Sequence, residues 1–135
     1  MNSNFKYIDY YKVKEHFEKR KITNKDFIYD YALFLSAYTN EISKAIKLFK
    51  KNKNFFEIGL IYEKKLYLNK AERYFKYAAR NDVRAVEHLI FYYLYFHKYR
   101  LMKKYLNVLF DKYPHKFYYS KTLLYLFKYK DLLTW

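Results

Sequence analysis

Histidines and clustered carboxylates are the side chains of this sequence that could carry catalysis or bind a metal. The four histidines are His16, His88, His97 and His115. No two of them stand four residues apart and no His-Glu-x-x-His occurs, so helical spacing does not predict a pair of metal ligands. Glu15 and Glu18 lie one helical turn apart among basic residues, which is typical of a solvated helix face with ion pairs. The sequence therefore predicts core or surface histidines and no metal site.

Other patterns of enzyme chemistry do not point to an activity either. There is no cysteine, and no serine stands in a nucleophile motif. The chain contains one glycine, so it has no glycine-rich loop to hold phosphates. We therefore expect a non-catalytic protein without a cofactor.

A basic, tyrosine-rich stretch is the second feature with a chemical consequence. The net charge is +15, and residues 84–135 carry ten Lys or Arg against three acids. Lysines on phosphates, with interleaved tyrosines stacking on unpaired bases, would suit RNA. The alternative is a solvated face that keeps a tyrosine-rich protein in solution, and AT-rich codons alone also supply Lys, Tyr and Phe. The residues predicted to contact nucleic acid are Lys98, Arg100, Lys103, Lys104, Lys112, Lys116, Lys121, Lys128 and Lys130.

The last segment, residues 115–135, combines several leucines and Trp135 with basic flanks. This pattern suits an anionic membrane surface, but a helix that caps a helical stack also needs an apolar face, and we favour the cap. The longest apolar run, Leu89–Phe96, is too short to span a bilayer. Because the N-terminus shows no secretory or transit pattern, we expect a soluble intracellular protein.

Helices are the elements expected to position these residues. One glycine and one proline leave few residues for the turns of a sheet protein, which favours an all-α fold with short polar loops. Asn24, Asn54 and Asp82 stand where helix N-caps are expected, and Pro114 stands where a helix ends or begins. Apolar periodicity predicts about eight helices. Their approximate ranges are 5–19, 27–38, 42–51, 55–64, 69–80, 83–96, 98–112 and 115–133.

The single glycine lies inside an apolar helical pattern, where it costs about 1 kcal/mol relative to alanine. Such a glycine usually marks a place where another helix lies too close for a Cβ atom. The pattern around it is Phe55-x-x-Ile58-Gly59-x-x-Tyr62, followed by Ala71-x-x-x-Phe75 and Ala78-Ala79. It resembles the tetratricopeptide (TPR) repeat and the related Sel1-like repeat. The resemblance implies structural roles for Gly59, Tyr62, Ala71, Phe75, Ala78, Tyr93 and Pro114.

The same pattern recurs on both sides of residues 52–83, where the match is best. It returns more weakly over 84–114, after a shift of 31 residues, and over 27–51, after a shift of 24 in the other direction. Three antiparallel helix pairs are therefore predicted over residues 25–114. Residues 1–24 and 115–135 are interpreted as caps, because a repeat array leaves an apolar face open at each end. The whole chain is predicted to be one short α-solenoid domain of stacked helix hairpins, and the alternative is a compact helical bundle.

In a TPR-like fold the first helices of the pairs line a groove, so the resemblance implies a protein-binding surface there. Exposed aromatic side chains beside Arg and Lys suit the anchoring of a peptide. The alternative is that Phe91 and Tyr95 are buried by another helix, because aromatic stripes at helical spacing are also typical of cores. The groove residues would be Phe56, Leu60, Lys64, Arg84, His88, Phe91 and Tyr95.

Two functional hypotheses follow from these features. The first is a structural subunit of a ribonucleoprotein particle such as a mitochondrial ribosome, with rRNA on the basic face and other protein subunits in the groove. The Phe, Tyr, Lys and Asn usage resembles that of organelle-encoded proteins. The second is a free adaptor that binds a peptide or helix of a partner protein. The sequence favours the first hypothesis, because a large positive charge favours a polyanionic partner.

Overall fold

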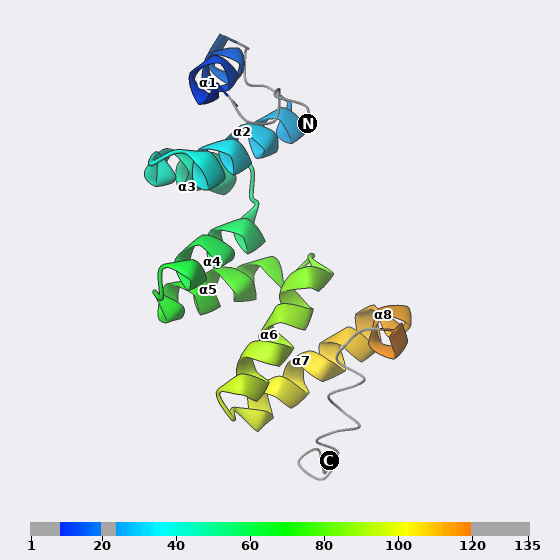
Figure 1. Ribbon diagram of the computed structural model, residues 1–135. Coiled ribbons are helices and arrows are strands. Elements are labelled where there is room, and N and C mark those ends of the chain that lie inside the picture. The colour runs from blue at the N-terminus through cyan, green and yellow to red at the C-terminus, as the bar shows by residue number, and fades with distance from the viewer. Residues whose placement is uncertain (1–8, 20–23, 120–135) are drawn as a thin grey trace, which may run out of the picture. The chain divides into compact units, whose positions relative to one another are not determined.

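The protein is all-α in its computed structural model, which describes residues 9–19 and 24–119 (Figure 1). Eight helices and no strand occur in these two ranges, which confirms the predicted helical-repeat fold. The helices are α1 (Tyr10–Lys19), α2 (Lys25–Tyr38), α3 (Ile42–Lys51), α4 (Phe55–Lys64), α5 (Leu68–Ala78), α6 (Val83–Tyr95), α7 (Tyr99–Lys112) and α8 (Pro114–Tyr119). They belong to two compact units, Met1–Asn54 and Phe55–Trp135, which are described separately. That the chain forms one domain stays a prediction.

In the first unit, α2 and α3 form an antiparallel hairpin and α1 packs against α2. Asn24 caps α2 as predicted, because its side-chain oxygen accepts hydrogen bonds from the backbone N–H groups of Asp26 and Phe27 at 2.8 and 3.3 Å. The Phe17 ring of α1 stacks on the Tyr31 ring of α2 with centroids 5.1 Å apart. The core of this hairpin consists of Tyr31, Phe34, Leu35 and Ala45, covered by Val13, Phe17 and Leu48.

In the second unit, α4 pairs with α5, α6 pairs with α7, and α5 packs against α6, so that two hairpins are stacked (Figure 1). The buried residues of the two hairpins follow the 31-residue shift. Position for position, Ile58 corresponds to Leu89, Ala71 to Met102 and Phe75 to Leu106, and all six are buried. One continuous apolar core therefore runs from α5 to α7.

Gly59 lies at the contact between α4 and α5. A Cβ atom at this position would stand 2.5 Å from Cε1 and 2.6 Å from Cδ1 of the Phe75 ring. Carbon atoms in contact are normally about 3.5–4.0 Å apart. Phe75 is fully buried, so its ring has no solvent to move into. The close approach expected at the only glycine is thus present, and the ring of Phe75 makes it.

Helices α3, α4 and α6 end in the same way, with a non-glycine residue at positive φ. These residues are Lys53 (φ 60°), Leu66 (φ 66°) and His97 (φ 57°). After each of them, the next backbone N–H bonds back over five residues, as in Tyr67 to Tyr62 and Lys98 to Tyr93. This is the Schellman motif, whose left-handed position is usually taken by glycine. The turns at Leu66 and His97 repeat the same geometry in the two hairpins of the second unit.

Most predicted helix bounds lie within two residues of the observed ones. Asp82 caps α6, with Oδ1 accepting from the backbone N–H of Arg84 at 3.0 Å. Pro114 is the first residue of α8, a position that suits proline because its N–H would be unpaired. Residues 5–8 of the first predicted helix and residues 120–133 of the last lie outside the described residues. Within those described, no helix has the length and apolar content that crossing a bilayer requires.

Candidate functional site

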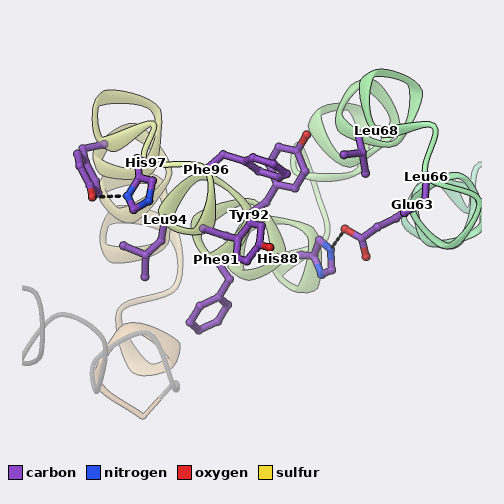
Figure 2. A pocket seen from close by; sticks show the side chains of 11 residues that line it. Glu63, Leu66, Leu68, His88, Phe91, Tyr92, Leu94, Phe96 and His97 are labelled. Carbon is purple, nitrogen blue, oxygen red and sulfur yellow. Dashed lines mark hydrogen bonds and ion pairs between the residues drawn. The ribbon is translucent and has the colours of Figure 1, made fainter.

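The second unit contains an open cleft of about 860 Å³ at the end of the hairpins where α4 leads into α5 and α6 into α7 (Figure 2). Helix α6 supplies one wall, from His88 to Tyr95. The rest comes from the turns after α4 and α6 and from the adjoining ends of α4, α5 and α7. The residues that line the cleft are Glu63, Leu66, Leu68, His88, Phe91, Tyr92, Leu94, Tyr95, Phe96, His97 and Tyr99.

Helical periodicity and turn geometry explain why these residues meet. Phe91, Tyr92 and Tyr95 lie three, four and seven residues after His88, so the four side chains share one face of α6. The positive φ of Leu66 and of His97 places both residues in the turns that border the cleft. Because the two turns are equivalent positions of stacked hairpins, the repeat itself brings them to the same end of the unit.

His88 and Glu63 connect α6 to α4 at the edge of the cleft. Figure 2 shows the His88 ring and the Glu63 carboxylate pointing toward one another, and Nε2 lies 2.8 Å from Oε2. An ionised carboxylate only accepts hydrogen bonds, so Nε2 carries the proton and donates it. The ring also packs against Phe75, at 4.4 Å between centroids, and against Phe56 at 5.9 Å. The hydrogen bond and the two ring contacts together hold the orientation of His88.

Large apolar side chains remain exposed around the cleft. Leu66 is 78% exposed, Tyr95 77% and Phe96 40%. Phe96 contacts the rings of Tyr92 and Tyr95, with centroid distances of 4.8 and 5.0 Å. These three rings therefore pack together and form an aromatic wall of the cleft. Such a concentration of exposed apolar surface beside a concavity is typical of a binding site.

The polar groups of the cleft carry little charge. None of the eleven lining residues is Lys or Arg, and Glu63 is the one carboxylate among them. Nδ1 of His97 lies 2.7 Å from the Tyr99 hydroxyl. Burial, together with the negative charges of Glu72 and Glu63, raises the pKa of Tyr92 above its ordinary value. Tyr92 therefore presents a neutral hydroxyl at physiological pH.

The structure brings only part of the predicted groove together. His88, Phe91 and Tyr95 line the cleft, and Tyr95 is exposed rather than buried under another helix. The alternative that Tyr95 is a core residue is therefore wrong. Leu60 and Lys64 are exposed residues of α4 that do not line the cleft.

Phe56 and Arg84, also predicted for the groove, belong to the contact between the hairpins. The Arg84 guanidinium hydrogen-bonds to Asp82 at 2.7 Å and to the buried Glu57 at 3.0 Å. It also lies 4.5 Å from the centroid of the Phe56 ring. These neighbours hold the charge of Arg84, and the two carboxylates raise the pKa of its guanidinium. The predicted groove residues thus fall into separate groups. Phe56 and Arg84 belong to the contact between the hairpins, whereas His88, Phe91 and Tyr95 line the cleft.

Sequence reasoning missed the turn residues of the cleft. Leu66 and His97 each follow the last residues of a predicted helix, at the position where a glycine would be expected. The apolar Leu66 in the connection between two predicted helices was a visible signal. Its contribution to a cleft could be inferred only from the stacking of two hairpins.

The basic residues predicted to contact nucleic acid lie mainly on the surface of α7 and α8. Lys103 is half-buried, and Lys121, Lys128 and Lys130 lie outside the described residues. The remaining ones, Lys98, Arg100, Lys104, Lys112 and Lys116, are exposed.

The interleaved tyrosines are held by the fold where the structure describes them. Tyr105 is buried and stacks on Tyr93 with centroids 5.9 Å apart, and burial raises its pKa. Tyr113 packs against the core, and Tyr99 hydrogen-bonds to His97. These three side chains therefore contribute to internal packing and contacts. At these three positions the rings therefore do not form a free platform for bases.

Among the described residues, no three His, Cys, Asp or Glu side chains converge in a way that could hold a metal ion. Comparison with known proteins produced no match to a family model, to a curated protein or to a solved structure.

Proposed function

We propose that this protein is a non-catalytic helical-repeat interaction module, similar to TPR and Sel1-like repeats, that binds a segment of a partner protein in the cleft beside α6. The observation that carries the proposal is the exposure of Leu66, Tyr95 and Phe96 around one concavity. Aromatic side chains at the centre of an interface supply much of its binding energy. The cleft volume falls within the range of about 300–1,000 Å³ that is common for ligand sites.

Preorganisation supports the same function. The Schellman turns fix the backbone of Leu66 and His97, and ring contacts hold Tyr92, Tyr95 and Phe96 against one another. A partner that enters this cleft would lose little free energy to the ordering of these side chains. A short peptide segment is the occupant that fits an open, aromatic cleft formed by helices and turns.

The test is a selection of random peptides displayed on phage against the full chain. We expect the enriched peptides to bind the Tyr95→Ala variant about tenfold more weakly, as for an aromatic residue central to an interface. Tyr11→Ala is the matched control, because Tyr11 is 83% exposed and does not line the cleft. Peptides that bind wild-type, Tyr95→Ala and Leu66→Ser proteins equally would refute the proposed function.

A second candidate function is contact with RNA in a larger assembly, such as a mitochondrial ribosome, while the cleft binds another protein subunit. Its support is the net charge of +15 and the exposed basic residues of α7 and α8. Binding of oligouridylate should then weaken steeply as salt rises. Reversing the charges of Lys103, Lys104 and Lys121 to Glu should remove it. The control is the double variant Lys50→Glu, Lys51→Glu. If it weakens RNA binding by the same amount per reversed charge, the binding depends on net charge and not on the surface of α7 and α8.

A further inference from the structure

The charge in the cleft differs from the charge of the chain. Lys and Arg account for 28 of the 135 residues, yet none of the eleven described lining residues is Lys or Arg and one, Glu63, is acidic. Lys64, Lys65 and Lys98 flank the two turns and are exposed, but they do not line the cleft. An anionic segment attracted by the whole chain would therefore find no Lys or Arg to pair with among the described residues that line the cleft.

The Glu63 carboxylate is positioned and accessible. Its side chain is 33% exposed, and its partner among the described residues is Nε2 of His88, which donates to Oε2. This hydrogen bond orients the carboxylate at the edge of the cleft. A cationic side chain that reached the carboxylate would form a charge-assisted hydrogen bond.

Helix ends of both signs border the cleft. Glu63 lies in the last turn of α4 and Tyr95 is the last residue of α6, while Leu68 and Tyr99 are the first residues of α5 and α7. A helix C-terminus carries the equivalent of about half a negative charge and an N-terminus about half a positive one, so the four ends offset one another. The Glu63 carboxylate is itself unfavourable in the last turn of its own helix, and a cation bound beside it would offset that term.

The aromatic wall offers the second element of cation recognition. Tyr92, Tyr95 and Phe96 line the cleft, and a cation over the face of such a ring, within about 6 Å of its centroid, is attracted to it. The same chain already uses this contact elsewhere, with the Lys70 ammonium 5.4 Å from the Tyr62 ring and the Arg84 guanidinium 4.5 Å from the Phe56 ring.

We infer that the cleft selects a peptide segment in which apolar side chains accompany a Lys or Arg, with the cation paired to Glu63 and the apolar side chains packed on Leu66, Tyr95 and Phe96. This inference rests on the proposed function and names the chemistry of its partner. It runs against the bulk charge of +15, which favours acidic segments. An experiment can therefore distinguish them: the cleft would select basic peptides, whereas the net charge would select acidic ones.

The experiment repeats the selection of random peptides on the full chain with heparin present, so that the basic surface is occupied by a polyanion. We expect the enriched sequences to combine Lys or Arg with apolar residues. A selected peptide should bind the Glu63→Gln variant about three- to tenfold more weakly than wild type, since the pair is partly exposed. Glu87→Gln, at a half-buried acid of α6 that does not line the cleft, is the matched control.

Changing the peptide tests the pair without altering the protein. The selected peptide with its Lys replaced by Met should bind wild type and Glu63→Gln equally, because the pair is then absent in both. Enrichment of acidic peptides, or of apolar peptides without a cation, would overturn the inference while leaving the proposed function intact. Equal binding of the Lys peptide to wild type and to Glu63→Gln would also overturn the inference and leave the proposed function intact. Enrichment that does not depend on Tyr95 would instead overturn the proposed function.

Discussion

Replacing Gly59 with alanine is expected to destabilise the second unit, even though alanine is the better helix former. The Cβ atom would stand 2.5 Å from the Phe75 ring, so the ring and the helix would have to separate by about 1 Å to restore normal carbon contact. The ring is buried and is held by Phe56 at 5.7 Å and His88 at 4.4 Å between centroids. Displacing it therefore disturbs the contact between the two hairpins as well.

Two opposing terms set the magnitude. Alanine gains about 1 kcal/mol of helix propensity over glycine. Overpacking a filled core costs about 1–3 kcal/mol. The net change for Gly59→Ala is therefore a loss of up to about 2 kcal/mol in the free energy of unfolding. Gly59→Leu should lose more and disrupt the packing of α4 on α5.

A double-mutant cycle separates the two terms. In a Phe75→Leu background the ring is gone, so Gly59→Ala should raise stability by up to about 1 kcal/mol through propensity alone. The free energy of unfolding is measured by urea denaturation with far-ultraviolet circular dichroism, and hydrogen exchange assigns the change to α4 and α5. If Gly59→Ala has the same effect in both backgrounds, the Phe75 ring is not the reason for the glycine, and the reasoning from the close approach is wrong.

Two further predictions follow from the helix ends and from the buried tyrosines. Leu66→Gly should raise the free energy of unfolding by about 1 kcal/mol, because it relieves a left-handed backbone, and should weaken peptide binding because it removes a cleft side chain. Lys53→Gly relieves the same strain and is the control; equal peptide binding by both variants would contradict the role of Leu66. Burial, together with the hydrogen bond to Glu72 and the negative charge of Glu72, raises the pKa of Tyr93 above its ordinary value of 10.0. The folded state therefore keeps this proton when the unfolded state loses it, so the contribution is full below about pH 10 and is lost as the pH rises further. The fall in urea midpoint from about pH 9 to about pH 11 should be shallower in Tyr93→Phe than in wild type, with Tyr95→Phe as the control at an exposed tyrosine.

The fold was largely predictable because its determinants are local. Apolar periodicity, the Asn24 and Asp82 caps and Pro114 locate the helices from neighbouring residues alone. The burial of the repeat positions, such as Ile58 and Leu89, follows from the same periodicity.

The site was less predictable because it depends on contacts between hairpins. Arg84 and Tyr95 lie on the same stripe of α6, but the first reaches back to Glu57 while the second extends into the cleft. Sequence spacing gives both the same direction and cannot show that α4 supplies a buried carboxylate to only one of them. The pairing of His88 with Glu63, 25 residues earlier, is equally a product of stacking.

The placement of the single glycine connects the fold to the cleft. Three helix ends adopt the backbone that glycine usually provides, and they are occupied by Lys53, Leu66 and His97 instead. A non-glycine residue there costs about 1–2 kcal/mol but keeps a side chain. At Gly59 a Cβ atom would collide with the buried Phe75 ring, and the helix propensity that alanine gains there, about 1 kcal/mol, opposes a packing cost of about 1–3 kcal/mol. In the second unit the strained positions are therefore those whose side chains, Leu66 and His97, form the cleft. Under the proposed function, relieving the strain at Leu66 or His97 should therefore trade binding for stability.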